Sequence, residues 1–256
     1  MNGTIAVRGL TKRYGAVTAV DALTFEVEPG VVTGFLGPNG AGKTTTLRML
    51  LGLVAPTAGE ALVDGRHYAD LKDPRRAVGA VLETTGFHPG RTGRDHLRVL
   101  AQAAGIPRSR VDQVLGQVGL ADAAGRRVRG YSLGMRQRLG LAAALLGDPR
   151  VLILDEPGNG LDPAGLAELR ELLRALAADE RTVLMSSHVL SEVAQTVDRV
   201  IIIAGGTLRY AGPLTRLTSA QGETLEAAFL RLTAGSGRTS AAGTTLVAGA
   251  GTPADH

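Results

Sequence analysis

The chain has 256 residues, of which 44% are hydrophobic and only 3% aromatic, so we expect one domain or two tightly joined lobes with an aliphatic core. It has no cysteine, which excludes a disulfide framework and any cysteine-based metal site. The net charge of +4 reflects a modest excess of basic residues, which we interpret as ordinary surface charge rather than as a nucleic-acid-binding surface.

Two features of the sequence bear on the cellular compartment. No run of about 18 or more apolar residues is present, so no membrane-spanning helix is predicted. Residues 1–4 lack the basic and apolar regions of a signal peptide. We therefore expect the protein to be cytoplasmic.

The first third of the chain reads mainly as strands. Some stretches alternate apolar and polar residues with period two, and others are short, continuous apolar runs that are typical of buried strands. A run compatible with a helix follows at residues 45–51. Strands of this region are predicted at residues 4–8, 22–27, 31–36, 61–63 and 78–82.

The residues between the strand at 31–36 and the helix at 45–51 fit the phosphate-binding P-loop pattern G-x-x-x-x-G-K-[ST]. Glycines allow the backbone N–H groups to turn inward toward phosphate oxygens, and the following helix adds the positive end of its dipole. We expect Lys43 to reach the β- and γ-phosphates and the Thr44 hydroxyl to bind Mg²⁺. The alternative is a glycine-rich turn that matches by chance, and the flanking strand and helix argue against it. The predicted phosphate-binding residues are Gly37, Pro38, Asn39, Gly40, Ala41, Gly42, Lys43, Thr44 and Thr45.

From about residue 85 to residue 147 the pattern is helical. Thr92 followed by Asp95 resembles a capping box that opens a helix. Apolar residues between 111 and 118 recur with the spacing of an amphipathic helix, and a third helical stretch covers residues 135–146. We interpret this block as an insertion into an α/β scaffold.

The scaffold resumes after this block. Residues 151–154 form the continuous apolar run that is expected of a central parallel strand. Asp162 and Pro163 are suited to the cap and the first position of a helix. Further strands are predicted at residues 182–185, 200–203 and 207–210, and a last helix at residues 223–232.

The alternation of strands and helices predicts an α/β fold with a mostly parallel sheet and helices on its faces. Residues 234–256 are rich in Gly, Ala, Ser and Thr and show no periodicity, so we predict a flexible tail.

Two carboxylates and a histidine follow predicted core strands, at the sheet edge where ligands bind in such folds. Asp155 is expected to hold Mg²⁺ from the far side of the P-loop, and Glu156 to orient or deprotonate water. His188 also follows a strand, and Tyr14 is expected in a loop from which it can stack on a nucleobase. The alternatives are an acidic strand end that faces solvent, a structural histidine and a surface tyrosine.

The stretch Tyr131-Ser-Leu-Gly-Met-Arg-Gln-Arg138 resembles the signature motif of ABC ATPases, with Ser132, Gly134 and Gln137 in their places. The order of motifs along the chain is also similar to that family, and the sequence Gly-Leu-Asp at residues 160–162 corresponds to its D-loop. The chain thus resembles the nucleotide-binding subunit of an ABC transporter over roughly residues 3–232.

The resemblance implies a role for each matching residue. Tyr14 corresponds to the aromatic residue that stacks on adenine, and Ser132, Gly134 and Gln137 to residues that bind ATP. The implied catalytic residues are Lys43, Glu156 and His188, and the implied metal ligands are Thr44, Asp155 and Glu83. The implied cofactors are ATP and Mg²⁺.

The sequence departs from the common family pattern in a few places. Glu83 follows the strand that ends at Leu82 and replaces the usual glutamine of the Q-loop. Leu133 and Met135 also differ from the commonest signature residues, and Gly158 stands where Thr or Ala is commoner. The resulting form, Ser-x-Gly-Met-Arg-Gln-Arg-Leu, resembles ATPases of bacterial drug, bacteriocin and lantibiotic exporters.

The implied fold is a P-loop NTPase of the ABC ATPase type, with a mostly parallel core sheet, an antiparallel N-terminal β part and an inserted helical subdomain. We predict an ATPase domain over residues 1–232, followed by a tail at 233–256. Within the domain, the core is expected at 1–84 and 148–215, the helical subdomain at 85–147 and a C-terminal helical piece at 216–232.

The resemblance also implies partners. Because the signature of one subunit contacts the γ-phosphate held by another in this family, a dimer, most simply a homodimer, is expected. A permease on a separate chain would place the protein on the inner face of the cell membrane, and no nucleic acid is expected as a partner. Export is preferred over import, and the remaining alternatives are a non-transport ABC ATPase and a catalytically silent binding module.

Overall fold

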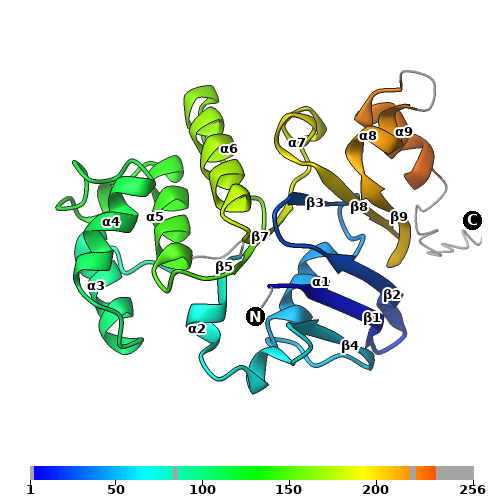
Figure 1. Cartoon of the computed structure of the whole chain (residues 1–256), viewed down its shortest axis with the longest axis horizontal. Coiled ribbons are helices and arrows are strands. Elements are labelled where there is room, and N and C mark those ends of the chain that lie inside the picture. The colour runs from blue at the N-terminus through cyan, green and yellow to red at the C-terminus, as the bar shows by residue number, and fades with distance from the viewer. Residues whose placement is uncertain (1–2, 83–85, 220–222, 235–256) are drawn as a thin grey trace, which may run out of the picture.

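The computed structural model describes residues 3–82, 86–219 and 223–234, so Glu83 and nearly all of the predicted tail lie outside the described residues. Within these residues the chain forms two β-sheets, with helices around the larger sheet and a block of helices at one end (Figure 1). None of the described helices is long and apolar enough to cross a lipid bilayer.

The smaller sheet is antiparallel, with the strand order β2–β1–β4. It confirms the strands predicted at residues 4–8 and 22–27, but both are longer than predicted. Pairing continues through polar residues, as where Lys12 lies opposite Val20, because backbone hydrogen bonds need no apolar side chain. Tyr14, which was expected in a loop, is the last residue of its strand. The bounds are β1 (Ile5–Tyr14), β2 (Val17–Val27) and β4 (Ala58–Val63).

The larger sheet has the strand order β5–β6–β7–β3–β8–β9, and all its neighbouring strands are parallel except the pair β8–β9. The predicted mostly parallel core sheet is confirmed. Because β6, β7 and β3 are neighbours and parallel, their carboxyl ends meet at one edge of the sheet. The bounds are β3 (Val32–Leu36), β5 (Val78–Val81), β6 (Val151–Leu154), β7 (Thr182–Ser186), β8 (Arg199–Ala204) and β9 (Thr207–Pro213).

Helices before and after the core strands complete the scaffold. The predicted cap of α6 is confirmed, since the Asp162 side chain accepts a hydrogen bond from the Gly165 N–H and Pro163 is the first helical residue. Helices α2 and α7 were not predicted, because segments of seven residues or fewer show little 3.6-residue periodicity, and α8 begins two residues before the predicted C-terminal helical piece at 216–232. Helix α9 ends at Thr233, one residue beyond the predicted end of the last helix. The bounds are α1 (Lys43–Leu50), α2 (Pro74–Ala77), α6 (Pro163–Ala178), α7 (Leu190–Thr196), α8 (Leu214–Ser219) and α9 (Leu225–Thr233).

The block of helices comprises α3 (Gly93–Ala103), α4 (Ser109–Gln117) and α5 (Leu133–Leu145), which lie together at one end of the molecule (Figure 1). The predicted start of α3 is confirmed, because the Thr92 side chain accepts a hydrogen bond from the Asp95 N–H. These three helices fit the predicted insertion, while the predicted domain boundaries stay a prediction.

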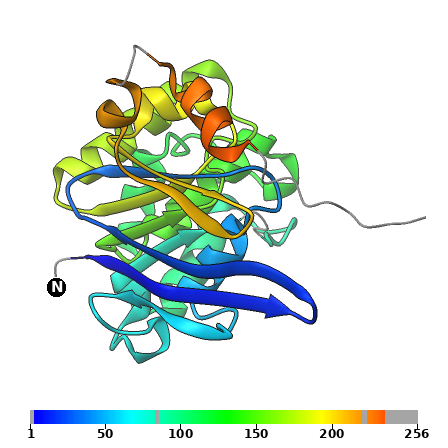
Figure 2. The ribbon, with the colours of Figure 1, turned by 90° about the vertical axis from the view of Figure 1, so that its right-hand side faces the viewer.

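The core sheet separates two hydrophobic clusters. In β6, Leu152 and Leu154 belong to the cluster shared with the helical block, whereas Val151 and Ile153 belong to the cluster shared with the antiparallel sheet. Burial on both faces explains why this strand is a continuous apolar run. Figure 2 shows strands β1 and β2 on the side of the molecule away from the C-terminal helices α8 and α9.

Candidate nucleotide-binding and hydrolysis site

The loop at residues 37–42 connects β3 to α1 and folds tightly against neighbouring backbone. Gly42 has a φ of +104° and caps α1, and a Cβ built there would lie 2.6 Å from the carbonyl oxygen of Ala19 on β2. A Cβ at Gly37 would lie 2.5 Å from the carbonyl oxygen of Ile203 on β8. Only glycine fits such close approaches. Helix α1 begins at Lys43, two residues before the predicted start, so the N–H groups of its first turn border the loop.

Lys43 is folded back into this loop. Its side chain is buried, and its Nζ donates a hydrogen bond of 2.6 Å to the carbonyl oxygen of Gly37 and one of 3.4 Å to that of Pro38. Burial lowers the pKa of Lys43, while the nearby carboxylates of Glu156 and Asp155 oppose that shift. The ammonium group is therefore a poorly hydrated cation that an anionic ligand would stabilise.

Asp155 lies at the end of β6, buried, with both carboxylate oxygens engaged. The Thr44 hydroxyl donates a 2.9 Å hydrogen bond to its Oδ2, and the Ser186 hydroxyl at the end of β7 donates to its Oδ1. Ser186 was not predicted from the sequence. The sequence feature that could have indicated Ser186 is its position at the end of a predicted strand. That strand, β7, is the neighbour of β6, and Leu154 pairs with Met185.

Glu156 follows Asp155 and lies beside His188, which was also predicted at the carboxyl end of a core strand. The His188 Nδ1 and the Glu156 Oε2 lie 2.7 Å apart, and the Glu156 N–H donates a 3.0 Å hydrogen bond to the Ser186 Oγ. Glu156 has a φ of +50° although it is not glycine and precedes Pro157. Residues held in such a conformation cluster at functional sites.

The loop, α1 and the two carboxylates border one pocket of about 480 Å³. Ala19 on β2 also lines it, which the sequence analysis did not predict. A pocket of this size, with a lysine and backbone N–H groups on one wall and carboxylates on another, suits a polyphosphate. The lining residues are Ala19, Asn39, Gly40, Ala41, Gly42, Lys43, Thr44, Thr45, Asp155 and Glu156.

Tyr14 does not line this pocket, as the described residues define it. The tyrosine is 51% exposed at the end of β1, and the Lys12 Nζ lies 4.9 Å from the centroid of its ring. Stacking of this ring on adenine therefore stays a prediction.

Ser132 and Gly134 line a second pocket of about 450 Å³, separate from the P-loop pocket. Ser132 is the N-cap of α5, and its Oγ accepts a 3.2 Å hydrogen bond from the Met135 N–H. Helix α5 begins at Leu133 rather than at residue 135 as predicted, because this cap sets its start. Gly160 and Asp162 of the predicted D-loop line the same pocket. Within one chain, Ser132 and Gly134 do not line the P-loop pocket, as the described residues define it.

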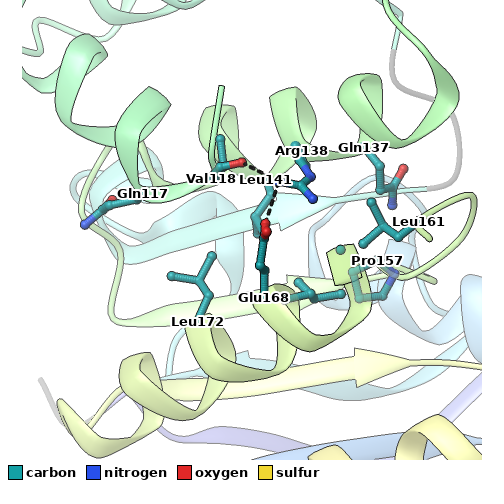
Figure 3. A pocket seen from close by; sticks show the side chains of 11 residues that line it. Gln117, Val118, Gln137, Arg138, Leu141, Pro157, Leu161, Glu168 and Leu172 are labelled. Carbon is teal, nitrogen blue, oxygen red and sulfur yellow. Dashed lines mark hydrogen bonds and ion pairs between the residues drawn. The ribbon is translucent and has the colours of Figure 1, made fainter. Parts of the chain in front are cut away.

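Gln137 lines neither of these pockets, as the described residues define them. Its Nε2 donates a 3.1 Å hydrogen bond to the backbone carbonyl oxygen of Glu156 in the same chain. Figure 3 shows Gln137 and Arg138 on α5, beside Pro157 and Leu161 of the loop after β6 and Glu168 of α6. The predicted contact of Gln137 with ATP stays a prediction.

The oxygen atoms beside the P-loop suit a hard cation such as Mg²⁺. Thr44 Oγ1 and Asp155 Oδ2 are 2.9 Å apart at the pocket wall. The described residues include no group of three or more His, Cys, Asp or Glu side chains that could hold a metal ion alone. A cation here would need phosphate oxygens and waters as further ligands, which is how proteins usually bind Mg²⁺.

Comparisons with known proteins agree with this geometry. Residues 20–159 match the ABC transporter family. A bacitracin transport ATP-binding protein from Bacillus licheniformis is 44% identical over 88% of this chain and 75% of its own length. A lantibiotic transport ATP-binding protein from Streptococcus pyogenes is 36% identical over 80% of this chain and 88% of its own length.

A solved structure of an ATP-binding subunit of an ABC transporter superposes with a TM-score of 0.81 at 28% identity, covering 89% of this chain and 98% of that one. The family match spans the P-loop and the strand that carries Asp155 and Glu156. The chain therefore belongs to the ATP-binding subunits of ABC transporters and is an ATPase.

Proposed function

We propose that this subunit powers the export of peptide antibiotics of the bacitracin or lantibiotic class through a membrane permease on a separate chain. The ATPase activity is supported by two contacts at the P-loop pocket. Thr44 is hydrogen-bonded to Asp155, and Glu156 contacts His188. The cargo is supported by the names of the relatives, which include bacitracin and lantibiotic transport proteins.

The P-loop pocket is proposed to hold the nucleotide. Inward-facing N–H groups of the loop and the start of α1 would bind the phosphates, and Lys43 would neutralise part of their charge. Thr44 and Asp155 would hold Mg²⁺ together with the phosphates, and the ion would neutralise charge that develops during hydrolysis. Tyr14 would stack on adenine, and Glu83 is proposed to contact the ion or its waters.

Glu156 is proposed to act as the general base. Its carboxylate borders the same pocket as the P-loop and can accept a proton from a water molecule that attacks the terminal phosphate. His188 contacts one oxygen of that carboxylate at 2.7 Å, which fixes its orientation. The other oxygen would then accept the proton of the water.

Ser132 and Gly134 are proposed to complete the site of a second subunit. In one chain they border a pocket of their own, so they can meet the phosphates of a P-loop only across an interface. We propose a homodimer that encloses two ATP molecules and binds a permease at the inner face of the membrane. Separation of the subunits after hydrolysis would drive the permease.

Replacement of the Lys43 codon by an alanine codon in the source organism tests the cargo. The variant subunit should still assemble with its permease but should not hydrolyse ATP, so susceptibility to bacitracin or to a lantibiotic should rise. Susceptibility to an antibiotic that is not a peptide serves as the control and should not change. Unchanged susceptibility to all peptide antibiotics would contradict the proposed cargo. It would not contradict the conclusion that the protein is an ATPase.

A further inference from the structure

Helix α5 and the end of strand β6 are joined by a side-chain contact within one chain. Gln137 is half-buried on α5, and its Nε2 donates to the carbonyl oxygen of Glu156 at 3.1 Å. Figure 3 shows the Gln137 side chain directed toward the loop that carries Pro157 and Leu161. The Gln137 amide therefore restrains the backbone at Glu156 in its own chain.

The backbone of Glu156 depends on such restraints. A φ of +50° is disfavoured for a residue with a Cβ, and the following Pro157 disfavours helical conformations further. The conformation is held by hydrogen bonds on both sides of the residue: its N–H donates to Ser186, and its carbonyl oxygen accepts from the N–H of Asn159 and from Gln137. Of these bonds among the described residues, the one from Gln137 comes from the helical block.

Neighbouring contacts fix the first turns of α5 against the same region. Arg138 Nη1 lies 2.6 Å from Glu168 on α6, and also donates to the carbonyl oxygen of Val118 at 3.5 Å (Figure 3). Leu133 packs against Gly160 in the loop between β6 and α6. Helix α5 is thus held in a defined position relative to the segment that carries Glu156.

We propose that Gln137 is a positioning residue that couples the orientation of helix α5 to the placement of the Glu156 carboxylate. The proposal rests on the general-base role of Glu156 stated above. When α5 is in the position described here, the Gln137 amide holds the carbonyl of Glu156 and the carboxylate stays beside His188. When α5 turns away, the bond breaks, and the carboxylate loses one of the restraints that direct it to the attacking water.

The first test replaces Gln137 by methionine, which keeps the length of the side chain and removes the N–H donor. Because the hydrogen bond is neutral and single, we expect kcat for ATP hydrolysis to fall about fivefold, with KM for ATP unchanged. The matched control is Gln117→Met on α4, an exposed position with no side-chain hydrogen bond among the described residues, and it should leave both constants unchanged.

A second variant is needed if Gln137→Met lowers the melting temperature of the protein. Gln137→Glu preserves the shape but presents a carboxylate to the carbonyl oxygen of Glu156, so its kcat should fall by more than that of Gln137→Met. A kcat equal to that of the wild type in a folded variant of either kind would overturn the proposal.

Combination with Glu156→Gln separates positioning from nucleotide contact. If Gln137 acts through the Glu156 carboxylate, Gln137→Met should not lower the residual rate of Glu156→Gln further, and ATP should still induce a dimer of the double variant. A dimer that is lost, or a raised KM with an unchanged kcat, would instead show that Gln137 contacts ATP across the interface. Fast turnover by Glu156→Gln alone would refute the general base itself, whatever Gln137 does.

Discussion

Glu156 has a backbone conformation that its residue type disfavours. Its φ of +50° costs about 1–2 kcal/mol for a residue with a Cβ. The surrounding hydrogen bonds stabilise it, and the result is a carboxylate 2.7 Å from His188 at the wall of the P-loop pocket. Such strained residues cluster at functional sites, and the strain here orients the carboxylate that we propose as the base.

Glu156→Gln should nearly abolish ATP turnover while ATP binding is retained. The amide cannot accept the proton of the attacking water, and a positioned base contributes about 10²–10⁴-fold to a rate. Steady-state release of phosphate measures the loss, and Glu171→Gln, an exposed position on α6, provides a control that should keep the full rate. A rate for Glu156→Gln above about a tenth of the wild-type value would show that the role is misassigned.

Tyr14→Ala should weaken ATP binding, and Tyr14→Phe should not. The ring is 51% exposed at the end of β1 and available to a base, and stacking is worth roughly 1–3 kcal/mol per base. Equilibrium binding of a fluorescent ATP analogue compares the three proteins. Equal affinities would mean that adenine does not stack on Tyr14, whose ring would then contact only Lys12 among the interactions described here.

The P-loop and α1 form one structural unit, and the loop can adopt its conformation only because glycines have no side chain. Gly42 combines a φ of +104° with close approach to the carbonyl oxygen of Ala19, which belongs to the antiparallel sheet. The loop is therefore shaped by β2 as well as by its own sequence. That contact also joins the smaller sheet to the phosphate-binding pocket.

Gly42→Ala should reduce ATP affinity by at least about tenfold, which corresponds to about 1.4 kcal/mol. A Cβ 2.6 Å from the Ala19 oxygen must displace either the loop or β2, and the new residue would also be strained at this φ. Isothermal titration with ATP measures the change.

Gly116→Ala provides the control for this substitution. Gly116 lies in α4, and a Cβ there would meet no described atom within 4 Å. Alanine in a helix is favoured over glycine by roughly 0.5–1 kcal/mol, so the melting temperature should rise slightly while ATP affinity is unchanged. If both variants bind ATP like the wild type, the loop tolerates a Cβ, and the close approach does not matter for binding.

At the scale of the whole molecule, the chain contains two parts of a site that do not meet. The P-loop and the two carboxylates border one pocket, and the capped start of α5 borders another. The helical block that carries α5 lies at one end of the molecule (Figure 1). A second copy of the chain can bring the two parts together, and this is the physical reason for the proposed dimer.

Ser132→Arg should leave ATP binding to the monomer largely intact but should block ATP-induced dimerisation. The arginine would fill the surface that the phosphates of the partner are proposed to approach, in a pocket that shares no lining residue with the chain's own P-loop pocket. Size-exclusion chromatography of the Glu156→Gln protein, with and without Ser132→Arg, measures the effect. Ser109→Arg, an exposed position at the start of α4, adds the same side chain to the same block and should not prevent the dimer. A dimer that persists with Ser132→Arg would rule out the contact between subunits.

Features that depend on neighbours within a few residues could be predicted from the sequence. The P-loop was predicted because its glycines and Lys43 lie in one run between a strand and a helix. The caps Thr92 and Asp162 were predicted because a cap acts on an N–H group three residues away. The continuous apolar run of β6 likewise indicated burial on both faces.

Contacts between residues of different elements could not be predicted and become visible in the folded chain. Ser186 supports Asp155 because β7 lies beside β6, and an ordinary serine at a strand end gives no sign of that. Gln137 contacts Glu156 rather than the P-loop pocket because α5 packs against the loop after β6. Ala19 reaches the P-loop because β2 is longer than its apolar pattern suggested. Local patterns carry information about local conformation, whereas the order of strands and the packing of helices arise from contacts between residues far apart in the chain.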